Sequence, residues 1–220
     1  MIPVLKILSA LLTYPTSELA ESVPEIRAAL ADDRSLPRAR VAALRPLLAR
    51  LGDADTTEAE EDYVDLFDRS RQLSLHLFEH VHGDSRDRGQ AMVDLKTLYE
   101  EGGLLIEANE LPDYLPLFLE FLSTRPEAEA RSSLSDVAHI LKAMHRRLVG
   151  RDAAYAAVVA AILAVAGEEV AAAEVELVDD GADALDSAWE EVPVAFGPDA
   201  APEQAGCGKV AGMLDRMRAL

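Results

Sequence analysis

Hydrophobic residues recur at helical spacing along most of the chain. The apolar residues between Val4 and Leu12 stand three or four positions apart, which predicts an amphipathic helix at the N-terminus. Nowhere do valine, isoleucine and threonine alternate with polar residues over a stretch long enough to predict a β-sheet. The pattern therefore predicts an all-α protein.

Local start and stop signals divide this pattern into separate helices. Ser22 with Glu25, and Thr57 with Glu60, match the capping box, in which an acid stands three positions after a serine or threonine. Further helix starts are predicted at Ser35, Ser85, Asn109 or Asp113, Ser133 or Ser135, and Asp152. Helix ends are predicted at Gly52, Gly102, Gly150 and Gly167, and a kink is predicted at Pro46.

The composition changes sharply after residue 151. From Asp152 to Gly208 the chain carries 13 acidic residues and no basic residue, and prolines and glycines interrupt the last part. We therefore predict that residues 1–167 form a single-domain helical bundle. Residues 168–220 are predicted to form an acidic, largely flexible C-terminal tail.

Charge and cysteine content exclude several kinds of partner and site. The chain of 220 residues has 21 basic and 40 acidic side chains, a net charge of −19, so nucleic acid and anionic membrane surfaces would be repelled. Its single cysteine, Cys207, excludes an intramolecular disulfide and a cysteine-rich metal site. The N-terminus lacks a basic leader, and the longest apolar run, Ala153–Ala166, is too short to cross a bilayer. We expect a cytoplasmic protein without membrane insertion.

One short motif is typical of an enzyme. His76, Glu79 and His80 form the H-x-x-E-H pattern of inverted zinc peptidases. On a helix the two histidines share a face, Glu79 is placed to polarise a zinc-bound water, and His82 adds a third imidazole nearby. A catalytic zinc also needs a third protein ligand, and no downstream acid stands at a persuasive position. One hypothesis is therefore a zinc metallohydrolase; the alternative is that these histidines are polar groups at a helix end or groove wall.

Two windows of the chain contain acids but no bases. Eight acids lie between Arg50 and Arg69, and six lie between Lys96 and Arg125. The windows also hold apolar and aromatic residues, namely Tyr63, Leu66 and Phe67 in the first and Tyr99, Tyr114, Leu117 and Phe118 in the second. If the windows meet, they form an apolar groove with acidic rims, which suits an amphipathic segment carrying arginine or lysine. The alternative, which physical grounds alone favour, is that the apolar residues are core and the acids are a solvated surface.

Four sequence blocks in order resemble a known family. They are YVDLF from Tyr63 to Phe67, FEHVHG from Phe78 to Gly83, SRDRGQAMVD from Ser85 to Asp94, and ELPDYLPL from Glu110 to Leu117. Together they resemble the NarJ-type nitrate reductase assembly chaperones, which belong to the wider TorD/DmsD-like group of maturation chaperones for molybdenum enzymes. The likeness covers about residues 1–167 and is most specific between Tyr63 and Leu122.

The resemblance implies an all-α, single-domain helical bundle of the TorD/NarJ-like type and a function without catalysis. Such a chaperone binds the N-terminal, twin-arginine-like segment of the apo nitrate reductase alpha (catalytic) subunit. Binding keeps that subunit competent for molybdenum cofactor insertion and delays its docking onto the membrane subunit. The resemblance implies no stably bound cofactor and allows molybdenum cofactor biosynthesis proteins as further partners.

The resemblance also implies which residues contact the client segment. They are Tyr63, Leu66, Phe67, Glu79, His80, His82, Glu110, Pro112, Asp113, Tyr114 and Leu117. Tyr114 stands where the group usually has histidine, so this position carries no group that titrates near pH 7. We expect the client helix to lay its apolar face on the aromatic residues while its arginines meet rim carboxylates.

Two questions stay open at this point. The acidic tail either increases solubility alone or folds back, with Trp189–Phe196 occupying the peptide groove. The protein is either a chaperone, a zinc hydrolase, or a helical adaptor without a client peptide.

Overall fold

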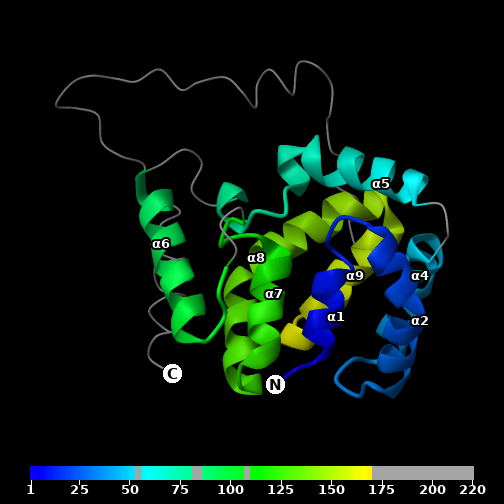
Figure 1. Ribbon diagram of the computed structural model, residues 1–220, viewed down its shortest axis with the longest axis horizontal. Helices are drawn as coiled ribbons and strands as arrows, with labels where there is room; N and C mark the ends of the chain where they lie inside the picture. The colour runs from blue at the N-terminus through cyan, green and yellow to red at the C-terminus, as the bar shows by residue number, and fades with distance from the viewer. Residues whose placement is uncertain (53–55, 81–85, 107–109, 170–220) are drawn as a thin grey trace.

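The computed structural model describes residues 1–52, 56–80, 86–106 and 110–169 (Figure 1). The α-helices are α1 (Val4–Ala10), α2 (Ser17–Asp32), α3 (Arg38–Ala43), α4 (Arg45–Leu51), α5 (Thr57–Tyr63), α6 (Arg86–Glu101), α7 (Leu115–Thr124), α8 (Glu127–Arg151) and α9 (Ala153–Ala166). Shorter segments are the π-helical turn η1 (Val64–Asp68) and the 3₁₀ turns η2 (Arg71–Leu73) and η3 (Leu77–His80). In these ranges the β-structure is limited to an isolated bridge between His76 and Tyr114. The all-α prediction is confirmed.

Helix α9 lies at the centre of the bundle. Its sequence is almost entirely alanine, valine, isoleucine and leucine, so the helix is apolar on every side and must be buried. α8 packs along it, α1, α3 and α4 contact it from other sides, and α1 in turn packs along α7 (Figure 1). Val158, Ile162 and Leu163 are completely buried. Together these contacts form one continuous hydrophobic core.

The predicted bounds of α9 are confirmed. Asp152 Oδ1 accepts hydrogen bonds from the backbone N–H of Ala154 at 2.8 Å and of Tyr155 at 3.0 Å, which satisfies donors at the start of the helix. At the other end, Gly167 has a φ of +80°, a left-handed conformation that ends the helix and that glycine adopts without strain.

Both predicted capping boxes are wrong. Ser22 lies inside α2, where its hydroxyl donates to the Glu18 carbonyl at 2.8 Å, and the helix begins instead beside Thr16, whose Oγ1 accepts from Leu19 N at 3.3 Å. Thr57 is already helical, since α5 begins one residue after Thr56. The helix starts earlier because its buried stripe already begins at Leu19 and continues past Ser22, which lies on the exposed side: Leu19, Val23, Ile26 and Leu30.

Two other helix starts also differ from the prediction. α8 begins at Glu127, directly after Pro126, because its buried face starts at Glu129 and Ala130, ahead of both predicted serines. α7 begins at Leu115 rather than at Asp113. The helix expected from residue 35 to 52 is divided into α3 and α4 near Pro46, whose missing N–H agrees with the predicted kink. The predicted starts at Ser85 and Asn109 lie outside the described residues.

None of the helices in the described part of the chain is both long and apolar enough to cross a membrane. The predicted tail, residues 168–220, lies outside the described residues from residue 170 onward, so its boundary stays a prediction. Of its first residues, Glu168 pairs with Lys142 Nζ at 2.6 Å.

Candidate functional site

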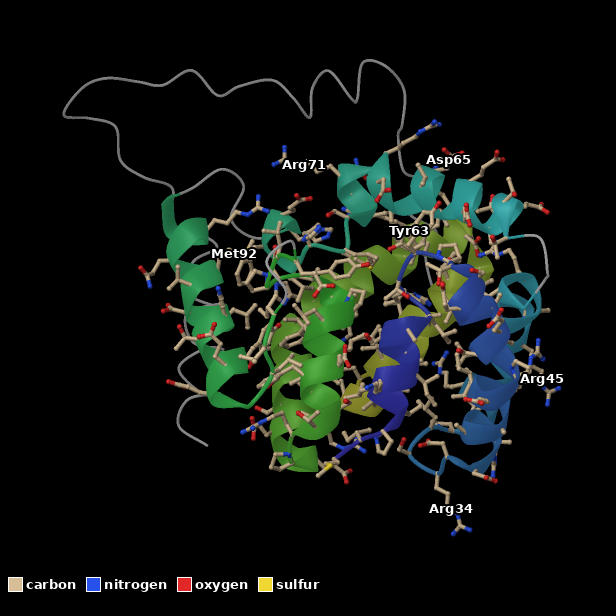
Figure 2. The ribbon with its side chains drawn as sticks, in the orientation of Figure 1. Arg34, Arg45, Tyr63, Asp65, Arg71 and Met92 are labelled. Carbon is tan, nitrogen blue, oxygen red and sulfur yellow. The ribbon has the colours of Figure 1, made fainter. Side chains whose placement is uncertain are left out.

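The first acidic window forms α5 and η1, which lie across one end of the bundle; we call these residues, 57–68, the cover (Figure 1). Its inner face buries Ala59, Tyr63, Leu66 and Phe67 against the core, and its outer face exposes four acids: Glu58, Glu61, Asp65 and Asp68. Figure 2 shows Tyr63 beneath the cover and Asp65 on its outer side. The π-helical turn marks a local irregularity, of a kind that occurs frequently at functional sites.

Tyr63 lies at the centre of an aromatic cluster under the cover. Its ring centroid lies 5.0 Å from that of Phe67, 5.6 Å from that of Tyr14 and 6.4 Å from that of Tyr155. Phe67 in turn meets Tyr155 edge-on, with the centroids 5.1 Å apart. Such tilted and edge-to-face pairs add to the free energy gained from burial alone.

The Tyr63 hydroxyl joins three separate segments. It donates to the Leu12 carbonyl at 3.0 Å and lies 3.2 Å from the Tyr114 hydroxyl. Burial raises the pKa of both Tyr63 and Tyr114, so both hydroxyls stay protonated and act only through hydrogen bonds. The two acidic windows therefore meet at this pair, as the groove hypothesis requires.

Asp113 anchors the second window and is completely buried. Its Oδ2 accepts from Phe78 N at 3.1 Å, and its Oδ1 lies 3.2 Å from His76 Nδ1. The Arg88 guanidinium lies 3.6 Å from Glu79 and 4.0 Å from Asp113. Because this carboxylate is needed by residues 76–78, it is not free to cap α7, which explains the error in the predicted helix start.

Backbone contacts complete the junction of these two loops. Leu77 N donates to the Asp113 carbonyl at 3.0 Å, and Leu115 N donates to the Leu75 carbonyl at 2.8 Å. The Tyr99 hydroxyl, fully buried, donates to the Pro112 carbonyl at 2.9 Å. The segment before α7 is thus tied both to α6 and to the loop that carries the histidines.

The histidines do not share a helix face. His76 is a bridge residue outside any helix, and its pKa is raised chiefly by the hydrogen bond to Asp113, against the effect of burial. His80 lies on a 3₁₀ turn, its Nε2 lies 2.8 Å from the Ser74 carbonyl, and burial lowers its pKa. Each imidazole therefore has a protein partner, and within the described ranges no three His, Cys, Asp or Glu side chains are grouped to hold a metal.

The predicted contact residues lie in one region but differ in exposure. Those that are buried are Tyr63, Leu66, Phe67, Pro112, Asp113 and Leu117. Glu79, His80 and Tyr114 are half-buried and Glu110 is exposed, while His82 lies outside the described residues. Most of the apolar positions are therefore core residues in this conformation, as the simpler sequence interpretation expected.

An open hollow of about 520 Å³ lies on the outer side of the cover. Its lining includes Tyr14, Val64, three acids and one base. The acids are Glu60, Glu61 and Asp65, and the base is Arg69, whose guanidinium lies 2.8 Å from Asp65 Oδ1. Tyr14 is 43% exposed, and its hydroxyl donates to Glu60 Oε2 at 3.1 Å. Tyr14 was not among the residues predicted from the sequence; its signal there was an aromatic residue followed by proline at the end of an apolar helix.

Fold and site together define an all-α bundle in which an acid-faced cover closes over a tyrosine cluster. Residues 17–161 match the family described as nitrate reductase delta subunit, and the chain belongs to this family. The resemblance stated from the four sequence blocks is thereby confirmed.

Named relatives agree with this membership. The chain is 43% identical over 210 residues to the nitrate reductase molybdenum cofactor assembly chaperone NarJ of Escherichia coli strain K12, covering 93% of this chain and 87% of that protein. It is 40% identical over 199 residues to the probable assembly chaperone NarW of the same strain, covering 88% and 83%. It is 29% identical over 161 residues to the probable assembly chaperone NarJ of Bacillus subtilis strain 168, covering 71% and 84%.

Proposed function

We propose that this protein binds the N-terminal segment of the apo nitrate reductase alpha subunit and keeps it competent for molybdenum cofactor insertion before membrane docking. The observation that carries the proposal is the 43% identity, across 93% of the chain, to a relative named as a molybdenum cofactor assembly chaperone. Family and relatives support a system-specific maturation chaperone and give no support to a zinc hydrolase. We further propose that the protein acts in the cytoplasm and holds no cofactor stably.

The acid-lined hollow is the first contact surface for a basic client segment. Client arginines there would face Glu60 and Glu61 and would compete with Arg69 for Asp65, while apolar side chains would meet Tyr14 and Val64. Exposed ion pairs contribute only about 0.2–1 kcal/mol each, so the acids chiefly orient the segment and raise its association rate. Most of the affinity must come from buried apolar contact.

Apolar contact with the predicted residues requires the cover to move. Phe67 is 5% exposed and Leu66 is 6% exposed, so a client helix reaches them only when the cover separates from the core. The polar contacts that this movement breaks include the Tyr63 bonds to Leu12 and Tyr114 and the Arg50–Asp62 pair. The client helix would then replace the cover's apolar contacts with its own, which makes binding reversible.

Calorimetric titration of a synthetic peptide, matching the N-terminal segment of the cognate alpha subunit, tests the proposal. Phe67→Ala is expected to weaken binding at least tenfold, about 1.4 kcal/mol, while Asp180→Ala in the tail leaves it unchanged. Because truncating a buried phenylalanine also costs about 3–5 kcal/mol of stability, circular dichroism must first show that the variant is folded.

A surface variant keeps the test informative if Phe67→Ala unfolds. Glu61 is exposed, so Glu61→Lys should leave the fold intact, slow peptide association and weaken its salt dependence. Glu21→Lys, an equal charge change at an exposed position of α2, is the matched control. If both variants bound the peptide with the association rate and affinity of the unmodified protein, that result would contradict the proposed surface.

A further inference from the structure

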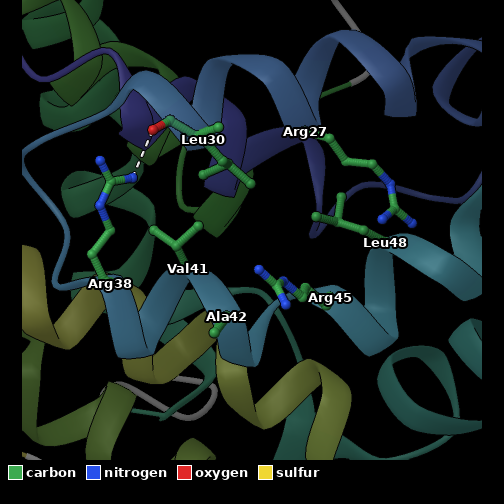
Figure 3. A pocket seen from close by; sticks show the side chains of 8 residues that line it. Arg27, Leu30, Arg38, Val41, Ala42, Arg45 and Leu48 are labelled. Carbon is green, nitrogen blue, oxygen red and sulfur yellow. Dashed lines mark hydrogen bonds between the residues drawn. The ribbon is translucent and has the colours of Figure 1, made fainter.

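Three arginines surround a second surface hollow, between α2 and the α3–α4 pair. This hollow has a volume of about 530 Å³, within the roughly 300–1,000 Å³ of typical binding pockets. Its rim carries Arg27, Arg38 and Arg45; its apolar lining includes Leu30, Val41 and Leu48. Figure 3 shows Arg27 and Leu30 of α2 facing Val41 and Arg45 across the hollow.

The arginine charges at this hollow are not neutralised by neighbouring side chains. Arg38 donates to the Ala31 carbonyl at 2.6 Å, which leaves its charge uncompensated. Arg27 and Arg45 form no ion pair with any residue in the described ranges, and no acid is among the described residues that line the hollow. The nearby Asp33 instead accepts from Ser35 N at 2.8 Å and Leu36 N at 3.1 Å, within the loop after α2.

The basic hollow stands out against the composition of the chain. Residues 27–50 contain six arginines and two aspartates, whereas the whole chain has a net charge of −19. An apolar hollow with three guanidinium groups suits an acidic segment that carries aromatic and aliphatic residues, through charge-assisted hydrogen bonds and cation–π contacts. The sequence contains such a segment.

We propose that the acidic segment Asp186–Asp199 of this same chain docks in the arginine hollow. The segment has four acids and no base, and its apolar residues are Trp189, Val192, Val194 and Phe196. Sixteen residues separate it from Glu169, and a fully extended chain of this length spans at most about 53–58 Å. A compact domain of 169 residues has a radius of gyration of about 15 Å and hence a diameter of about 40 Å, so the separating residues are long enough to reach this face.

Charge also decides between the two hollows. The hollow on the cover is lined by three acids and one arginine, Arg69, so its net negative charge repels an acidic segment, whereas the arginine hollow, with three arginines and no acid in its lining, attracts it. Docking at the arginine hollow neutralises a basic surface and leaves the acid-lined cover free for a basic client. The inference does not depend on the proposed function, because it concerns a contact within one chain.

Trp189 is the single tryptophan of the chain, so its fluorescence reports directly on the segment. In the full-length protein we expect a blue-shifted emission that acrylamide quenches poorly. Arg45→Glu should shift the emission to that of an exposed indole and restore quenching, as should 1 M NaCl, where the screening length falls to about 3 Å. Arg45 is exposed at the start of α4, where an acid is tolerated, so this variant should fold.

Arg34→Glu is the matched control, since Arg34 is exposed in the loop after α2 and points away from the bundle (Figure 2). It should leave the emission and the quenching of Trp189 as in the unmodified protein. A fully accessible Trp189 in the unmodified protein, or equal shielding in the Arg45→Glu variant, overturns the proposal.

A nitroxide attached to Cys207, the single cysteine, gives an independent reading. The proposal expects it to weaken NMR amide signals of α2, α3 and α4, and expects these signals to recover in the Arg45→Glu variant. Weakening concentrated on the cover would place the segment at the client site. Weakening that grows with protein concentration would show that a second copy supplies the segment, and either result overturns the proposal.

Discussion

The α8–α9 pair and the cover contact the same aromatic cluster but are held in different ways. α9 is apolar on every side, is capped at both ends and is packed among α1, α3, α4 and α8. The cover buries one face and is tied down by single polar contacts, such as the Arg50–Asp62 pair at 3.2 Å and the Tyr14–Glu60 hydrogen bond at 3.1 Å. The α8–α9 pair therefore has more interactions that hold it in place, and the cover is the region whose movement the proposed client binding requires.

Arg50 connects the two regions. Its NH1 lies 2.6 Å from Asp152 at the start of α9 and 3.2 Å from Asp62 in the cover, and its guanidinium lies 5.0 Å from the Tyr155 ring centroid. A change in α9 should therefore lower the stability of the whole protein. A change at an exposed acid of the cover, such as Glu61, should alter peptide binding more than stability.

Within α9 the largest effect is expected for Ile162→Ala. Ile162 is completely buried, so removing its side chain leaves a cavity and should lower the free energy of unfolding by about 2–5 kcal/mol. Urea denaturation measures this loss, and Leu105→Ala, at an 83% exposed position, should change it by less than about 0.5 kcal/mol. An equally small effect of both variants would break the comparison, because α9 would then not carry the core.

Next in size is the effect of Asp152, which both caps α9 and pairs with Arg50. Asp152→Ala removes both interactions and should cost about 2 kcal/mol, within the range for loss of an N-cap together with a charged hydrogen bond. Asp152→Asn keeps an oxygen for the cap and should cost about half as much. Thermal unfolding measures the stability that each variant loses. Equal losses in the two variants would mean that the whole effect comes from the pair with Arg50.

A smaller effect is expected at the hydroxyl pair under the cover. Tyr114→Phe removes one hydrogen bond and should cost about 0.5–1.5 kcal/mol, while Tyr63→Phe also leaves the Leu12 carbonyl without a donor and should cost more. A double-mutant cycle in urea isolates the coupling between the two hydroxyls. Zero coupling would mean that this contact does not help to hold the cover closed.

The smallest effect is a pH dependence that arises from His76. Since pairing with Asp113 raises the pKa of His76, its stabilising contribution is complete below the unfolded value of about 6.5 and is lost as pH rises through the folded-state pKa. The difference in unfolding free energy between the unmodified protein and His76→Gln should therefore shrink as pH rises above about 6.5.

The contribution of His80 has the opposite sign, because burial lowers its pKa and its stabilisation is lost as pH falls. It is present in both proteins and cancels in the difference. His139→Gln, at an exposed position of α8, controls for the loss of an imidazole. A difference that grows with pH would contradict the pairing of His76 with Asp113.

Sequence prediction of helix ends succeeded where no long-range contact or longer apolar stripe overrode the local capping signal. Asp152 and Gly167 bound a run that is apolar on every side, and both ends of α9 were predicted correctly. The helix start predicted at Ser22 was wrong because Ser22 lies inside α2, where there is no helix end to cap. The helix start predicted at Asp113 was wrong because its carboxylate bonds to Phe78 and His76. These residues lie 35 and 37 positions earlier in the chain, and no local pattern reveals such contacts.

The sequence by itself determined the helical class, the central helix, the family and the two acid-only windows, because these depend on local spacing, composition and ordered blocks. Only the tertiary structure decided that Tyr63 meets Tyr114, that Phe67 is buried beneath the cover, and that three arginines gather around one hollow. The physical reason is that burial and charge pairing depend on which distant segments pack together. Helical periodicity says which face is apolar, but not what covers it.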